Sequence, residues 1–259
     1  MSQYISSLST AQTLLQHGLY AFNSRTVADL FDLDKFQTAR LLHRMERDGL
    51  VAAVERGKYL LLGLTPEKVL SNPLYIGVSM VSPAYISFWS ALHFHGLTEQ
   101  VPLTVFVATT RRKSQMTFHG TRYQFVTIKP QAFFGYRREL VDDLPILIAD
   151  EAKTILDSLI LPEYAGGIAE AAKALQIAVS EKMLDVNELI AYAVRLKSGS
   201  LASRLGYLLE LLHQPTEGLP VPQGPVLLDP HQTERGTFHS RWKIYANIPT
   251  GELFPQGIV

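Results

Sequence analysis

The side chains best suited to chemistry in this sequence lie on one short basic stretch, residues 35–48. Lys35, Gln37 and Arg40 are spaced so that a helix would carry them on its first two turns. A glutamine side chain can pair with two atoms of adenine and an arginine with two atoms of guanine, and each such contact contributes about 1–3 kcal/mol of discrimination between bases. The pattern therefore predicts a helix that reads base edges in the major groove of duplex DNA.

The opposite side of this predicted helix is apolar. Positions i, i+3, i+4 and i+7 are occupied by Thr38, Leu41, Leu42 and Met45. Such spacing is typical of a helix with one face against a hydrophobic core. Asp34 is placed to cap the start of the helix and Gly49 to end it.

Further elements surround this helix. Short helices are predicted at 9–18 and 26–31, and a hairpin is predicted at 51–62, turning at Arg56-Gly57. Three helices followed by a hairpin with a basic tip predict a winged helix-turn-helix, which we assign to residues 1–64. The proposed contacts to phosphate or the minor groove are Arg44, Arg56 and Lys58.

The remainder, residues 65–259, is predicted to form a mixed α/β domain, so that the fold class is α+β. Helices are predicted at 65–72, 84–95, 151–160, 167–182, 186–196 and 201–213, and strands at 103–110, 115–120, 121–128, 144–149, 226–229 and 242–248.

Charge is unevenly distributed although the whole chain has a formal net charge of +0. Residues 103–138 contain seven basic side chains and no acidic one, whereas residues 139–259 contain nine basic and sixteen acidic ones. The candidate second basic surface consists of Arg111, Arg112, Lys113 and Arg122. It is expected either to contact DNA or RNA, or to dock on the acidic C-terminal half within one chain or between subunits.

Several classes of protein are disfavoured. The sequence has no cysteine, which excludes disulfides, thiolate metal sites and a cysteine nucleophile. No phosphate-binding loop, nucleophile elbow or zinc-protease motif occurs, so we predict neither catalytic residues nor a cofactor or metal. Asp150 and Glu151 are expected to cap a helix. No apolar stretch approaches the ~20 residues that span a bilayer, and no secretory leader is visible, so a soluble, cytoplasmic protein is expected.

The sequence resembles the AbiE-type abortive-infection antitoxins, bacterial transcriptional regulators of type IV toxin–antitoxin systems, over almost its whole length. The segments that carry the resemblance are RLLHRMERDGLVAAVERGKYLL at 40–61, SPAYISFWSALHFHGLTEQ at 82–100, IADEAKTILDSL at 148–159, GYLLELL at 206–212, VLLDP at 226–230 and RWKIYANIP at 241–249. The second of these segments is the most distinctive, because many regulators share the winged-helix part.

The resemblance implies an N-terminal winged helix joined to an α/β antitoxin domain. It also implies that the protein represses its own operon by binding inverted repeats, and that it counters a nucleotidyltransferase-like toxin without requiring a stable complex. Asp34, Glu46 and Asp48 make the DNA-binding helix less basic than this family leads us to expect, which favours cooperative binding of two copies.

Two other functions remain open. The second domain of a winged-helix regulator can sense a small ligand, and a ligand-dependent shift in melting temperature would support that function. The basic segment also allows an enzyme that acts on nucleic acid, for which folding would have to bring carboxylates or histidines together in the second domain.

Overall fold

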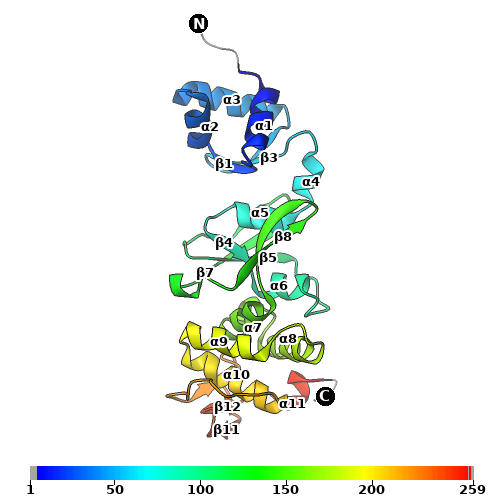
Figure 1. The fold of residues 1–259 in the computed structure, drawn as a ribbon, viewed down its shortest axis with the longest axis vertical. Coiled ribbons are helices and arrows are strands. Elements are labelled where there is room, and N and C mark those ends of the chain that lie inside the picture. The colour runs from blue at the N-terminus through cyan, green and yellow to red at the C-terminus, as the bar shows by residue number, and fades with distance from the viewer. Residues whose placement is uncertain (1–4, 256, 258–259) are drawn as a thin grey trace.

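The computed structural model describes residues 5–255 and 257, which form eleven α-helices and three β-sheets (Figure 1). The fold is therefore mixed α+β. Along the long axis of the molecule, an N-terminal part is followed by the largest sheet, which has six strands, then by a layer of helices and a small sheet near the C-terminus (Figure 1).

The N-terminal part contains three helices and a three-stranded antiparallel sheet of order β1-β3-β2. Its elements are α1 (Ser7–Gln16), β1 (Ala21–Asn23), α2 (Ser24–Phe31), α3 (Lys35–Arg47), β2 (Val51–Glu55) and β3 (Lys58–Leu61). The predicted helices and hairpin are confirmed, and the side chains of Ser6, Asn23 and Asp34 cap the starts of α1, α2 and α3. These elements enclose a hydrophobic core of their own that includes Leu14 and Met45.

The central sheet has the strand order β6-β7-β5-β4-β9-β8. Its strands are β4 (Ala84–Ile86), β5 (Thr104–Thr109), β6 (Met116–Phe118), β7 (Thr121–Thr127), β8 (Tyr136–Val141) and β9 (Leu144–Ala149). The pairs β5–β7 and β4–β9 are parallel, and the other pairs are antiparallel. The helix α5 (Pro73–Ser79) packs against β4, β5 and β9, and α6 (Phe88–Phe94) packs against β5.

One prediction in this region is partly wrong. The segment expected to be helical at 84–95 begins as the strand β4, and the helix starts only at Phe88. All three residues of β4 are buried because the strand lies inside the sheet. A short, wholly buried strand shows no apolar–polar alternation, so periodicity cannot distinguish it from the start of a buried helix.

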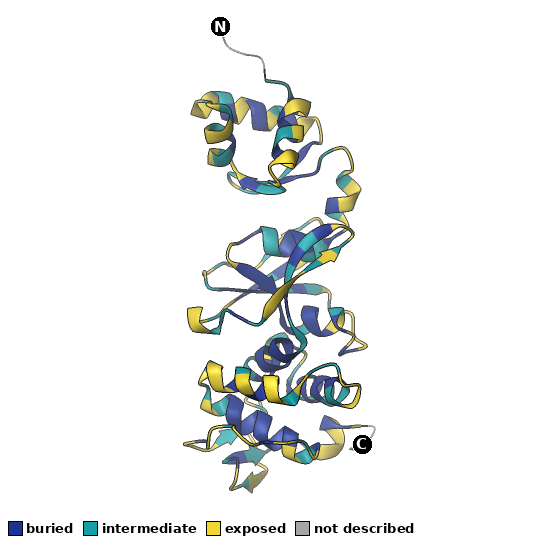
Figure 2. Ribbon diagram, in the orientation of Figure 1, coloured by how far each residue is buried: buried dark blue, intermediate teal, exposed yellow. Residues whose placement is uncertain are grey.

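The helical layer packs below the sheet around the largest hydrophobic core. Its main helices are α7 (Glu151–Ile160), α8 (Ile168–Ser180), α9 (Val186–Leu196) and α10 (Gly199–Leu211), and it is followed by β10 (Val226–Leu227), β11 (Thr237–His239), β12 (Ile244–Ala246) and α11 (Thr250–Leu253). Figure 2 shows that buried residues run through α7 and α10. Gly206 is required in α10 because a Cβ there would lie 2.3 Å from the Trp242 ring.

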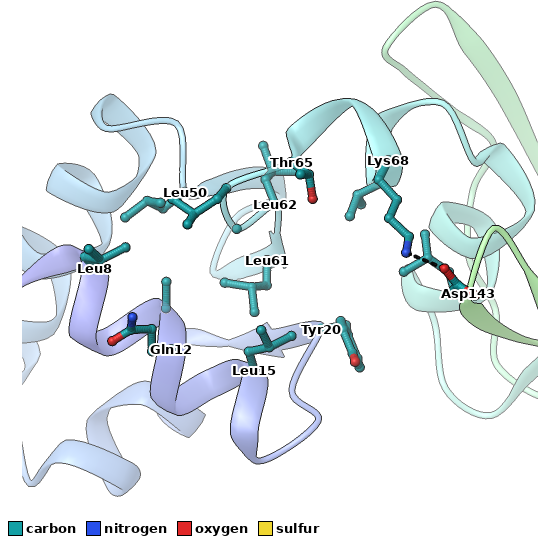
Figure 3. A pocket seen from close by; sticks show the side chains of 15 residues that line it. Leu8, Gln12, Leu15, Tyr20, Leu50, Leu61, Leu62, Thr65, Lys68 and Asp143 are labelled. Carbon is teal, nitrogen blue, oxygen red and sulfur yellow. Dashed lines mark hydrogen bonds and ion pairs between the residues drawn. The ribbon is translucent and has the colours of Figure 1, made fainter.

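The N-terminal part joins the sheet through a short connection and α4 (Pro66–Leu70). An apolar pocket of about 400 Å³ lies at this junction, between leucines of α1 and the end of β3 (Figure 3). At its rim Lys68 Nζ and Asp143 Oδ2 form an ion pair at 2.9 Å. No helix in the described residues has both the length and the apolar character needed to cross a membrane.

Candidate nucleic-acid interface

The helix α3 presents one apolar and one cationic face. Its buried residues are Thr38, Leu41, Leu42 and Met45, as the sequence predicts. Lys35 and Arg40 are exposed, and none of the described residues forms an ion pair with either of them. His43 and Arg47, further along the same helix, are also exposed, and Arg47 Nε lies 3.7 Å from Asp48 Oδ1. Because Lys35 and Arg40 have no ion-pair partner among the described residues, their charges are available to bind an anionic ligand.

The start of α3 is fixed by a reciprocal capping arrangement. The Asp34 carboxylate accepts hydrogen bonds from the backbone N–H groups of Phe36 and Gln37, both at 2.8 Å. In return, Gln37 Oε1 accepts from the backbone N–H of Asp34 at 3.0 Å. This bond holds the Gln37 side chain against the helix terminus, so a base contact by Gln37 would have to use its amide NH₂ group or break the cap.

Arg44 lies on α3 but points to α1. Its Nε donates to Ser7 Oγ at 3.0 Å, and its Nη2 donates to the backbone carbonyl of Ile5. The side chain is half-buried. Sequence spacing groups Arg44 with the phosphate contacts, whereas the structure gives it a role in holding α1 on α3.

The hairpin β2–β3 turns at Gly57, where φ is +74°, a backbone conformation that favours glycine. The Gly57 carbonyl accepts from the backbone N–H of Ser24 at 2.9 Å, which places the hairpin tip beside the start of α2. Arg56 is exposed at this tip. Tyr59 stacks on Phe22 with ring centroids 5.9 Å apart, and so anchors the hairpin on β1.

The remaining predicted contact of the hairpin, Lys58, is exposed, and its ammonium group lies at the end of α5. Its ammonium group donates to the Met80 carbonyl at 3.3 Å and lies 3.4 Å from Glu55 Oε2. Arg111 lines the same cleft of about 350 Å³ as Lys58. The loop after β5 therefore lies next to the hairpin, although the two are separated by more than fifty residues in the sequence.

Members of the second basic surface have different surroundings. Arg111, Arg112 and Arg122 are exposed. Lys113 forms an ion pair with Glu55 of β2 and lies 5.0 Å above the Phe125 ring, and burial lowers its pKa. Lys113 thus docks on the N-terminal hairpin and not on the acidic C-terminal half.

One arginine of the basic segment 103–138 does bind a carboxylate of the acidic C-terminal half. Arg137 donates through Nη1 and Nη2 to both carboxylate oxygens of Glu151, at 2.6 and 2.8 Å. These hydrogen bonds hold the pKa of Glu151 at about 2, below its ordinary value of 4.5. His95 Nδ1 lies 3.4 Å from the same carboxylate.

A buried polar cluster at the start of α7 was not predicted from the sequence. Lys153 is fully buried, and its Nζ bonds to Asp157 Oδ1 and, at 2.9 Å, to the Tyr85 hydroxyl. Asp157 Oδ2 accepts from Ser87 Oγ at 2.7 Å and from the Tyr85 hydroxyl at 3.1 Å. Burial, together with the Asp157 charge, raises the pKa of Tyr85 well above its ordinary value.

The only sequence signal for this cluster is the i, i+4 spacing of Lys153 and Asp157, which places the two side chains on one face of a helix. Asp150, predicted to cap this helix, does so by accepting from the backbone N–H of Lys153 at 2.7 Å.

In residues 5–255 and 257, no group of three or more histidine and carboxylate side chains is arranged to hold a metal ion.

Comparison with known proteins gives a likeness of fold. No protein-family model and no curated protein matches this sequence. The crystal structure of the RV2827C protein from Mycobacterium tuberculosis is similar, with a TM-score of 0.61 over 97% of this chain and 95% of that chain. Sequence identity is 12%, so the likeness concerns the fold alone.

Proposed function

We propose that this chain is a DNA-binding transcriptional repressor and an antitoxin of the AbiE type. In this proposal residues 1–64 form a winged helix-turn-helix, and α3 enters the major groove of an operator that contains inverted repeats. Residues 65–259 form the antitoxin domain, which counters a nucleotidyltransferase-like toxin. The toxin and the operator follow from the resemblance of the sequence to that family.

The observation that carries the DNA-binding proposal is the two-faced character of α3. The helix uses Leu41, Leu42 and Met45 to pack on the N-terminal core, and leaves Lys35 and Arg40 exposed. A helix of this kind next to a hairpin with an exposed basic tip fits the docking geometry of winged-helix proteins, with α3 reading bases and Arg56 contacting phosphate.

The loop after β5 extends the proposed DNA surface beyond the N-terminal part. Lys113 pairs with Glu55 and holds the loop at the hairpin, while Arg111 and Arg112 stay exposed. Because phosphate contacts need only a cation near the backbone of the duplex, these two arginines would add affinity without adding sequence discrimination.

An enzymatic function is less well supported. The polar groups that folding brings together around α7 bond to one another: Asp157 is 4% exposed and its two carboxylate oxygens are engaged by Lys153, Ser87 and Tyr85. A general base has to reach a substrate proton within hydrogen-bond distance. The engaged, buried carboxylate therefore favours a structural role.

The proposal is tested with the full chain and a fluorescent duplex taken from upstream of its own gene. We expect this duplex to bind more tightly than a scrambled duplex of the same composition, with an affinity that falls steeply as salt rises. Arg40→Ala should remove most of the preference for the upstream duplex, because it removes a base contact. Arg56→Ala should weaken binding to both duplexes and reduce the salt slope by about 1.

The matched control is Arg235→Ala, which removes an exposed arginine near the C-terminus. It should leave both affinities unchanged. If Arg40→Ala and Arg56→Ala bind the upstream duplex as tightly as the wild type does, α3 and the hairpin are not the DNA-binding elements and the proposal fails.

A further inference from the structure

A second pocket lies between the central sheet and the helical layer, away from α3. It has a volume of about 300 Å³ and is lined from four separate segments of the chain: the start of α6, the end of β7 with the turn after it, the end of α7, and the junction of α9 and α10. Pockets that bind small molecules start at about this volume, and a cavity of about 150 Å³ is enough for a benzene ring.

The inner lining of this pocket is apolar. The side chains that supply it are Phe88, Ile128, Ala132, Ile160, Leu161 and Leu196. Phe88 has a φ of +55°, a left-handed conformation that is strained for a bulky side chain, and it is fully buried. Strained residues of this kind are found mostly at binding sites, where the surrounding structure holds them in place.

The charges around the pocket favour an anion. Its titratable lining residues are Asp157, Lys129 and Lys197. Asp157 is already compensated by the buried Lys153, whereas Lys129 and Lys197 are exposed. None of the described residues forms an ion pair with these two lysines, so the pocket combines an apolar interior with two available ammonium groups.

We infer that this pocket binds a small anionic molecule with an apolar body, namely an aromatic or short-chain aliphatic carboxylate. The hydrocarbon part contacts the half-buried Ile128, Ile160 and Leu161, and the carboxylate pairs with Lys129 and Lys197. Burial of the hydrocarbon supplies affinity, and the ammonium groups supply selectivity for the charged form. None of the residues that line this pocket belongs to α3 or to the β2–β3 hairpin, so this binding does not depend on the proposed DNA-binding function.

The test uses the full chain and titration calorimetry with three carboxylates, benzoate, 2-naphthoate and octanoate. At least one is expected to bind and to raise the melting temperature. The neutral amide of the best binder should bind at least tenfold more weakly, because the charge-assisted bonds are lost. Sodium sulfate at equal ionic strength should not bind, because it has no apolar part.

Variants locate the site. Lys129→Gln and Lys197→Gln should each weaken carboxylate binding about tenfold. Lys182→Gln is the matched control, because Lys182 is also an exposed lysine that follows a helix with a positive φ, +57° against +51° for Lys197. It should bind like the wild type. Ala132→Leu places a larger side chain in the pocket and should abolish binding. Because Ala132 is only half-buried in a turn, the variant should keep the circular dichroism spectrum of the wild type.

The inference is overturned if none of the three carboxylates binds, or if the amide binds as tightly as the acid. It is also overturned if Lys182→Gln weakens binding as much as Lys197→Gln, since the cations would then act only through the net charge of the protein. A folded Ala132→Leu variant with unchanged affinity would place the carboxylate elsewhere.

Discussion

Charged side chains on α3 and on α7 have opposite surroundings. On α3, Lys35 and Arg40 are exposed and without ion-pair partners among the described residues. On α7, Lys153 is fully buried and bonds to Asp157 and Tyr85. A buried charge is tolerated only with its partners in place, whereas an exposed cation contributes little to stability and is available for a ligand. The comparison separates charges that hold the fold together from charges that can serve binding.

The largest effect is expected at the buried pair. Lys153→Met leaves the Asp157 carboxylate buried without its cation and should lower the free energy of unfolding by about 3–5 kcal/mol. Urea denaturation at pH 7 measures this loss. The double variant Lys153→Met/Asp157→Leu removes both charges and should recover at least half of the loss. Equal stability of Lys153→Met and wild type would show that the pair is not buried.

The next effect distinguishes two arginines on one helix. Arg44→Ala removes the hydrogen bonds to Ser7 and Ile5 and should cost about 1–3 kcal/mol of stability. Arg40→Ala removes an exposed side chain and should change stability by less than about 0.5 kcal/mol. Thermal unfolding of the two variants side by side gives the comparison, and equal melting temperatures would contradict it.

A smaller effect depends on pH. The pKa of Glu151 is depressed to about 2 by Arg137, so its contribution to stability is present above the ordinary value of 4.5 and is lost as pH falls from 4.5 toward 2. Arg137 is 43% exposed, so solvent screening keeps this contribution below about 1 kcal/mol. Arg137→Ala should therefore be less stable than wild type at pH 7 and equally stable near pH 2, as measured by urea denaturation. A difference that is the same at both pH values would contradict this account.

The smallest effect is expected at the rim of the junction pocket. Lys68 is 40% exposed and Asp143 is 88% exposed, so their ion pair should contribute no more than about 0.5 kcal/mol. Lys68→Ala should leave the melting temperature almost unchanged. A loss as large as that of Arg44→Ala would mean that this pair fixes the N-terminal part on the sheet.

Local patterns explain which elements of the N-terminal part could be predicted. Asn23 and Asp34 accept hydrogen bonds from nearby backbone N–H groups, and Leu41 and Met45 recur with helical spacing, so neighbouring residues decide both features. The three-residue strand β1 was missed, because it pairs with β3 across more than thirty residues and is too short for a periodic pattern. The strand β8 and the helix α5 were missed in the central part.

The candidate site could be predicted only in its exposed part. Lys35, Arg40 and Arg56 are exposed as expected, because the polar side of an amphipathic helix and the tip of a hairpin face solvent. The hydrogen bonds of the half-buried Arg44 and the exposed Lys58 depend on Ile5 and Met80, and the pairing of Lys113 depends on Glu55. Such contacts join segments that are distant in the sequence, and local spacing contains no information about them.

The central claim, that α3 reads base edges, is tested most directly by selecting bound duplexes from a random pool with the full chain. Wild type should recover a defined inverted repeat. Arg40→Ala should recover the same repeat with discrimination lost at one or two base pairs in each half, corresponding to about 1–3 kcal/mol per contact. Identical recovered sequences for the wild type and Arg40→Ala, or no enriched sequence for the wild type, would contradict the account.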